Sequence, residues 1–378
     1  MFAVMKISRK SLTIGVIGSW MLINILLYFY MGFKYAIDTL RFDEEATTWL
    51  RGHFEFSYHF WYAGYIAILA LSKLIFGSIY CSIFLQCALS LIAVISFFNA
   101  LERIFKNTNI AFFSTLPVIL YYPIQIWNMC LLTESIYISL ILLFIWAYSL
   151  LNKKKWFYLI SIAVAASITR PNGGILIITL IILYIYDQWT TNRQFAKRLL
   201  GASILICIPC LILFLQYSTD VYLQFLMQSF NKGEIICGYS GWIVPVNSIN
   251  AESIHNNSIS QVLTLMLKYP LEYIQLACYR FLALWSDIRP YYSFSHNLYI
   301  IVSLSLLYIF AGIGLIRYAK KYSDLFMLTI SYCVFNSLII MITYADWDGR
   351  FLAPLLPVVF IWSGLGIYSF LRYFKKIK

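Results

Sequence analysis

Long apolar runs separated by short charged segments constrain the fold of this chain more than any other feature. A helix that crosses a bilayer needs about 20 mainly apolar residues, and ten runs approach that length: 11–32, 80–100, 110–129, 132–151, 156–169, 173–189, 199–218, 298–316, 325–344 and 351–371. Apolar residues make up 61% of the 378 positions and charged residues 12%, whereas soluble domains average about 25% charged. The sequence predicts an all-α polytopic membrane protein with about ten transmembrane helices.

The charged residues predict how these helices are oriented. With a cytoplasmic N-terminus, ten spans place 18 of the 28 basic and 3 of the 16 acidic residues inside, so the net charge of +12 divides into +15 inside and −3 outside. Basic residues favour the cytoplasmic side of a membrane protein. We therefore expect both termini in the cytoplasm and the first run, which no small-residue cleavage site follows, to remain as an anchor. The positive charge then reports orientation rather than nucleic-acid binding.

Two long segments on the outer side are where function is expected. Residues 33–79 and 219–297 form connections much longer than those on the cytoplasmic side, and long loops are usually functional. All four histidines and 13 of the 16 carboxylates also lie outside. We expect three modules: a membrane module at 1–218 with the catalytic loop 33–79, the loop 219–297, and a three-helix module at 298–378. Amphipathic interfacial helices are expected in both long loops.

The first outer loop contains three consecutive carboxylates, Asp43, Glu44 and Glu45, which we call the acidic segment. One interpretation is structural: Asp43 caps a short interfacial helix that Gly52 ends. The other interpretation is catalytic. Crowded carboxylates disfavour one another's ionised form, which suits one of them to accept a proton. Asp43 is the candidate general base with Glu44 beside it, and residues 59–77 are expected to be interfacial or re-entrant rather than spanning.

Several short motifs occur one after another along the chain. They are Asp43-Glu44, Gly64-Tyr65, Lys73 to Gly77, Thr133-Glu134, Arg170-Pro171, and the segments 269–293 and 349–357. In this order the chain resembles the integral-membrane glycosyltransferases of the GT-C superfamily, in particular bacterial relatives of the dolichyl-phosphate-mannose protein mannosyltransferases and of the lipid A aminoarabinose transferase. One departure is Tyr62-Ala63-Gly64-Tyr65, where the family usually has Pro-Pro-Gly-Tyr.

The resemblance implies a donor sugar carried on a polyprenyl phosphate and a glycan, lipid or protein acceptor on the outer face of the bacterial inner (plasma) membrane. Asp43 would take a proton from the acceptor hydroxyl as the oxygen attacks the anomeric carbon with inversion. Membrane lipids are the other expected partners, and nucleic acid is not expected.

The remaining candidate residues would hold the substrates. Arginine binds phosphate bidentately, so the candidate donor-phosphate ligands are Arg170, Arg289 and Arg350. The candidate substrate contacts are Glu134, His59, Tyr65 and Tyr292. Structural alternatives stand beside these roles: Arg170 could reach the lipid headgroups, Arg350 could pair with Asp346 and Asp348, and Glu134 could simply favour a helix start.

A divalent metal is the one cofactor that the acidic segment could hold with His53 and His59, although the spacing matches no specific ligand pattern. Two other functions compete with transfer. An outer-face glycan polymerase or ligase typically has an arginine-rich outer loop, whereas residues 33–79 are acidic. A lipid or sugar transporter more often places ionisable groups at the centres of its spans, and these spans carry almost none.

Overall fold

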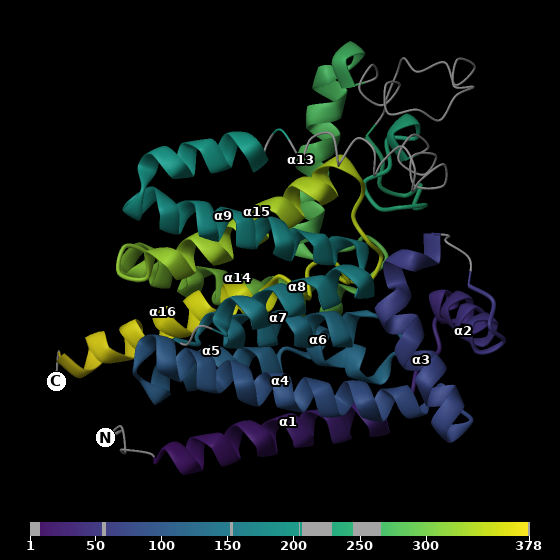
Figure 1. Cartoon of the computed structure of the whole chain (residues 1–378), viewed down its shortest axis with the longest axis horizontal. Coiled ribbons are helices and arrows are strands. Elements are labelled where there is room, and N and C mark those ends of the chain that lie inside the picture. The colour runs from purple at the N-terminus through teal and green to yellow at the C-terminus, as the bar shows by residue number, and fades with distance from the viewer. Residues whose placement is uncertain are drawn as a thin grey trace. The chain divides into compact units, whose positions relative to one another are not determined.

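The computed structural model describes residues 8–54, 58–151, 154–203, 205, 229–244 and 266–376, and these residues are organised mainly as helices (Figure 1). Within these ranges there is no strand, and three isolated β-bridges join loop residues. The helices are α1 Arg9–Met31, α2 Ile37–Leu50, η1 Tyr58–Tyr62, α3 Ala63–Phe76, α4 Cys81–Phe105, α5 Thr108–Leu120, α6 Tyr122–Gln125, η2 Ile126–Met129, α7 Glu134–Tyr148, α8 Lys155–Thr169, η3 Pro171–Gly173, α9 Gly174–Thr191, α13 Pro270–Ser286, α14 Phe294–Tyr318, α15 Ser323–Ile342 and α16 Leu356–Lys376.

The chain divides into two compact units. Unit 1 comprises Met1–Leu180, Leu306–Thr329 and Ala353–Lys378, and unit 2 comprises Ile181–Ser305 and Ile330–Leu352. Unit 1 thus takes segments from the first and the third of the expected modules, whose boundaries stay a prediction. The expected loop 219–297 is described only at 229–244 and 266–297, and most of the expected span 199–218 lies outside the described residues.

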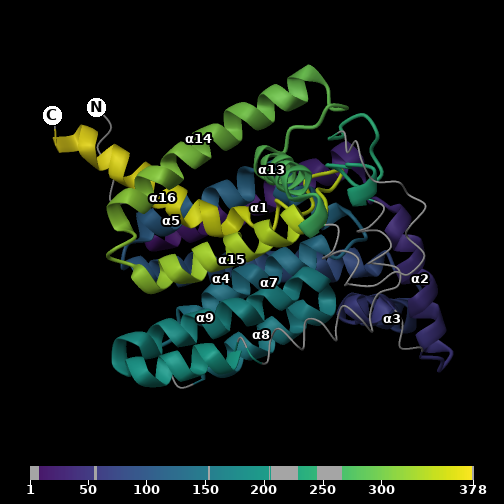
Figure 2. The same ribbon diagram turned by 90° about the horizontal axis from the view of Figure 1, so that it is seen from above.

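Unit 1 is organised around α7. This helix packs against α4 and α8, while α5 packs against α4 and α16. Residues 134–142 of α7 are all buried, as expected for a helix that is apolar on every side. The start of α1 and the end of α16 lie at one end of unit 1, and α2 and α3 lie at the other (Figures 1 and 2).

Glycines allow α14 and α16 to pack closely. A Cβ atom on Gly314 would lie 2.1 Å from the Trp362 carbonyl oxygen, and one on Gly366 would lie 1.9 Å from the Phe310 carbonyl oxygen. Small residues of this kind let membrane helices approach through their backbones. The Gly-Leu-Gly sequence at 364–366 therefore serves helix packing.

The helices support a membrane protein, but they differ from the ten expected spans. Among the described residues, seven helices are long and apolar enough to cross a membrane, or eight if the bent pair α5 and Tyr122–Met129 is one span. Two expected spans are the 15-residue helices α7 and α8, which are short for a full crossing. Conversely, His59–Phe76, expected to be interfacial or re-entrant, is among the seven.

The expected third span, 110–129, is not one straight helix. Its two parts meet at an angle of 68°. Pro123 lies one residue into α6, where its fixed φ suits a new helix start. The amide nitrogen of Gln86 in α4 donates to the carbonyl oxygens of Asn128 at 3.1 Å and Cys130 at 2.8 Å, so backbone acceptors near the end of the bent pair are satisfied by a side chain.

Candidate active site in unit 1

The helix α2 carries the acidic segment, and its first turn is fixed to the loop before α7. Thr39 accepts a hydrogen bond from the Ala36 amide at 3.0 Å and donates one to the Leu131 carbonyl at 2.8 Å. Helix α2 therefore begins at Ile37. The interpretation of Asp43 as the helix cap is wrong, because Asp43 lies inside the helix. Gly52 has φ +81° just beyond the last turn, consistent with its expected place at the helix end.

Asp43 is held by a lysine from the neighbouring helix. Lys73 of α3 forms an ion pair with the Asp43 carboxylate and donates a 2.6 Å hydrogen bond to the Thr47 hydroxyl. Both charged side chains are partly exposed, at 24% for Lys73 and 28% for Asp43. Burial and the adjacent Asp43 carboxylate raise the pKa of Tyr35. Asp43 is thus oriented by its neighbours and remains accessible to solvent.

The other two carboxylates of the acidic segment have different surroundings. Glu44 is exposed. Glu45 lies 3.0 Å from His59 Nδ1 and accepts a 3.0 Å hydrogen bond from the Trp49 indole nitrogen. His59 therefore contacts the third carboxylate of the segment, and its expected role in substrate binding stays a prediction.

A buried ion pair links α7 to the end of α8. Arg170 Nη1 lies 3.0 Å from Glu134 Oε1, and the two side chains are 7% and 0% exposed. The Arg170 guanidinium also lies 5.9 Å from the centre of the Tyr137 ring. The expectation that Arg170 reaches lipid headgroups is contradicted by this burial. Glu134 begins α7, where a carboxylate also interacts favourably with the helix dipole.

Tyr65 connects this pair to the helix that carries Asp43. Its side chain is fully buried, and its ring lies 5.5 Å from that of Phe42, the residue before Asp43. Helix α3 packs against α8, at whose end Arg170 lies. Beside Tyr65, a Cβ on Gly64 would lie 2.9 Å from the Thr169 hydroxyl. Glycine at 64 therefore allows α3 to pack closely on the end of α8.

Four predicted residues of unit 1 thus lie on neighbouring elements: Asp43 on α2, Tyr65 on α3, Glu134 on α7 and Arg170 after α8. Sequence reasoning did not assign Lys73 as the partner of Asp43, nor Gln86 as the support of the loop before Glu134. Lys73 belongs to the motif Lys73 to Gly77 already noted, so the sequence did mark this lysine as a candidate. Gln86 had a signal too, because an amide side chain inside an apolar run needs a partner.

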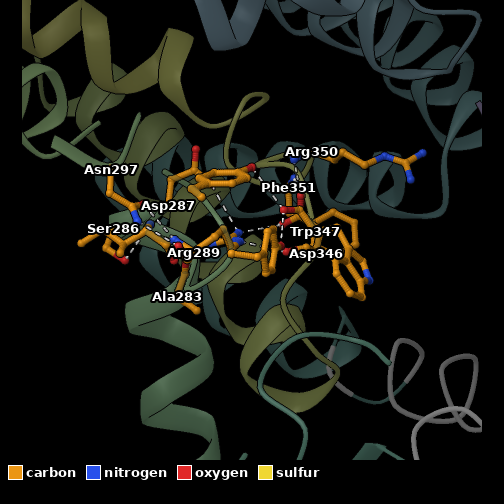
Figure 3. A network of polar contacts seen from close by, with 12 residues as sticks. Ala283, Ser286, Asp287, Arg289, Asn297, Asp346, Trp347, Arg350 and Phe351 are labelled. Carbon is orange, nitrogen blue, oxygen red and sulfur yellow. Dashed lines mark hydrogen bonds and ion pairs between the residues drawn. The ribbon is translucent and has the colours of Figure 1, made fainter. Parts of the chain in front are cut away.

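Arg289, in unit 2, lies inside a separate network (Figure 3). Its side chain is fully buried, and Nη2 lies 3.3 Å from Asp287 Oδ1 and 3.5 Å from Asp346 Oδ1. Its other nitrogens donate to the carbonyl oxygens of Ala283 at 2.8 Å and Asp346 at 3.1 Å. Like Arg170, Arg289 is buried beside carboxylates, and its expected phosphate-binding role stays a prediction.

Burial also changes the acidity of this network. It raises the pKa of Asp287 to about 7, against the opposing effect of Arg289, and the nearby Asp346 and Asp348 raise it further. One arginine close to two buried carboxylates cannot fully compensate both negative charges. Asp287 has φ +54°, and a Cβ on Gly349 would lie 2.7 Å from its carboxylate. Sequence reasoning missed Asp287 because nothing in its local pattern marks it as buried.

Arg350 and Tyr292 also belong to unit 2. The backbone amide of Arg350 donates to the Asp346 carboxylate, while its guanidinium points away from Asp287, Arg289 and Asp346 (Figure 3). The expected alternative, in which the Arg350 side chain pairs with Asp346 and Asp348, stays a prediction. Tyr292 donates through its hydroxyl to the Trp347 carbonyl at 3.2 Å.

Among the described residues, no group of three or more His, Cys, Asp or Glu side chains is arranged to hold a metal ion. The expected divalent metal at the acidic segment therefore has no ligand set in this part of the chain. Comparisons with protein-family models, with curated proteins and with solved structures give no match to this chain.

Proposed function

We propose that this protein is an integral-membrane glycosyltransferase that moves a sugar from a polyprenyl phosphate to an acceptor hydroxyl on the outer face of a bacterial inner membrane. The observation that supports this most is the partly exposed Asp43 carboxylate on α2, a helix packed against α3, in a unit that also holds the buried pair of Glu134 and Arg170. The ordered motifs of the GT-C superfamily are the second support, and the apolar helices that would admit a lipid donor are the third.

In the proposed reaction, Asp43 takes the proton of the acceptor hydroxyl as the acceptor oxygen attacks the anomeric carbon. The bond from that carbon to the phosphate oxygen breaks on the opposite face of the sugar, and the polyprenyl phosphate leaves with the electron pair. The configuration at the anomeric carbon is inverted. A general base of this kind typically contributes about 10²- to 10⁴-fold to the rate, and Glu44 would assist from the adjacent position.

The leaving phosphate gains negative charge, which a cation in a partly dry site stabilises strongly. Arg170 is our candidate, because its guanidinium is a rigid fork of donors and Glu134 fixes its position at 3.0 Å. Arg350, which lies in unit 2, stays a prediction of the sequence. In this proposal Glu134 and Tyr65 shape the site beside Asp43.

The test compares cells with and without the protein by mass spectrometry of polyprenyl-phosphate sugars and of surface glycans. We expect one polyprenyl-phosphate sugar to accumulate and the matching sugar to disappear from one surface glycan, lipid or protein when the protein is absent. Unchanged glycans and unchanged polyprenyl-phosphate sugars would contradict transfer. A surface glycan that keeps its sugars but loses its length would favour a polymerase or ligase instead.

A further inference from the structure

Four aromatic side chains of unit 2 pack into one cluster, which we call the aromatic platform: Tyr239, Tyr291, Tyr292 and Trp347. The ring centres of Tyr291 and Trp347 lie 5.1 Å apart, and that of Tyr239 lies 5.1 Å from the first and 5.5 Å from the second. Tyr292 packs edge-on against Tyr291 at 5.2 Å. The platform is thus built from three segments that are far apart in the sequence.

Polar groups of the platform are bonded to the protein backbone. The hydroxyls of Tyr291 and Tyr292 donate to the Trp347 carbonyl at 2.5 Å and 3.2 Å, and the Trp347 indole nitrogen donates to the Cys237 carbonyl at 2.7 Å. The strand-like contact between the Cys237 amide and the Ala345 carbonyl, 3.1 Å long, fixes the two segments to each other. These bonds hold the rings in place before any ligand arrives, which lowers the entropic cost of binding.

The platform is nevertheless partly open to solvent, with Tyr239, Tyr291 and Tyr292 half-buried. Trp347 is 41% exposed, and its indole points away from the Arg289 network (Figure 3). A large exposed ring that is held rigidly marks an interaction site more often than a scattered surface residue does. Its surroundings are polar: Asp348 follows it and is exposed, and Gly238 and Ser240 flank Tyr239 on the exposed surface.

These surroundings decide which ligand fits. Lipid chains are disfavoured, because Asp346, Asp348 and Arg350 lie within three residues of Trp347. A cation held in an aromatic cage needs space between the rings, whereas these rings contact one another. A saccharide suits the platform, because the weakly positive C–H face of a pyranose packs on the negative face of an aromatic ring. Its hydroxyls can bond to an exposed carboxylate such as Asp348.

We propose that the aromatic platform binds a pyranose ring of a hydroxyl-rich saccharide. Its assignment as the acceptor glycan rests on the proposed glycosyl transfer, whereas saccharide binding does not. The platform would also explain Gly241, where a Cβ would lie 2.5 Å from the Tyr239 ring. Any larger residue at position 241 would displace the Tyr239 ring.

The test measures binding of the full-length protein, reconstituted in nanodiscs, to an array of neutral and acidic bacterial oligosaccharides. We expect the wild type to bind at least one of them, and Trp347→Ala and Tyr239→Ala each to weaken that binding at least about tenfold. Trp347→Phe should restore part of it, because the ring remains although the indole hydrogen bond is lost. Trp189→Ala is the matched control, since Trp189 is 38% exposed but lies on α9 outside the platform.

No binding to any oligosaccharide, or equal binding by Trp347→Ala and Tyr239→Ala proteins that elute as the wild type does on size exclusion, would overturn the proposal. Binding of tetramethylammonium or of lipid vesicles that depends on Trp347, with no saccharide bound, would also overturn it. An Asp43→Asn variant separates the two proposals. If it binds the saccharide as the wild type does, the platform stands whether or not transfer occurs.

Discussion

Arg170 and Glu134 form an ion pair of 3.0 Å although 36 positions separate them, and both side chains are buried. Each charge is costly to bury alone, so each requires the other. The pair joins the start of α7 to the end of α8. Both helices should therefore depend on this pair for their stability.

Replacing Glu134 with Gln should destabilise the protein by about 3–5 kcal/mol, because the Arg170 charge would remain buried without its counter-charge. Unfolding in detergent, followed by tryptophan fluorescence, measures the change. The double variant Glu134→Leu/Arg170→Leu should recover much of the loss, since it removes both charges. A Glu134→Gln protein as stable as the wild type would show that the ion pair contributes little to the free energy of unfolding.

Gln86→Leu should also destabilise unit 1, by about 1–3 kcal/mol. The substitution removes the donor that the Asn128 and Cys130 carbonyl oxygens use, and both residues are buried. The same unfolding measurement compares it with Gln188→Leu on α9, where the side chain is half-buried. Equal effects of the two substitutions would contradict a specific supporting role for Gln86.

Two glycines of unit 1 offer a matched pair for helix packing. Gly366→Ala should cost about 1–3 kcal/mol, because the new methyl group would overlap the Phe310 carbonyl and separate α16 from α14. Gly312→Ala should be neutral or slightly stabilising, since nothing lies within 4 Å of its Cβ position and alanine favours the helix. Thermal unfolding of both variants distinguishes them, and equal melting temperatures would contradict the close contact.

Asp287 predicts a pH dependence of stability. Its folded-state pKa is raised to about 7 from 3.8, so between these values the folded protein binds a proton that the unfolded chain does not. Stability should therefore increase as the pH falls from 8 to 5, by at most about 1.4 kcal/mol per pH unit. Asp287→Asn should remove this part of the dependence, and asparagine tolerates the left-handed backbone at this position.

Melting temperature measured from pH 5 to pH 8 tests this expectation. The Glu272→Gln variant of α13 serves as the control, because Glu272 lies in the first turn of that helix, away from Asp287. An Asp287→Asn protein with the pH dependence of the wild type would show that another group is responsible.

The sequence predicted the helices with continuous apolar runs well. The run 298–316 corresponds to α14 and 325–344 to α15, within a few residues at each end. It did not predict the 68° bend after α5, where the backbone carbonyls near the end of the bent pair are satisfied by Gln86 from another helix. The start of α2 was missed for a related reason: Thr39 fixes it through a bond to Leu131, 92 positions away.

The residues of the candidate site were easier to predict than their partners. Charged and polar residues in an apolar chain are conspicuous, which identified Asp43, Glu134 and Arg170. Pairing is a property of the fold, so neither Lys73 with Asp43 nor Glu134 with Arg170 followed from spacing. The partners of Arg289 did not follow from the sequence either, because Asp346 in its buried network comes from a distant segment.

Transfer by the Asp43→Asn variant is the most direct test of the proposed function. Cells that produce this variant, an Asp38→Asn control on the same helix or the wild type are compared by mass spectrometry of polyprenyl-phosphate sugars and surface glycans, after equal membrane levels are verified. We expect Asp43→Asn to accumulate the donor and to lose transfer by about 10²-fold or more, and Asp38→Asn to match the wild type. Full transfer by Asp43→Asn would contradict the role of Asp43 as the general base.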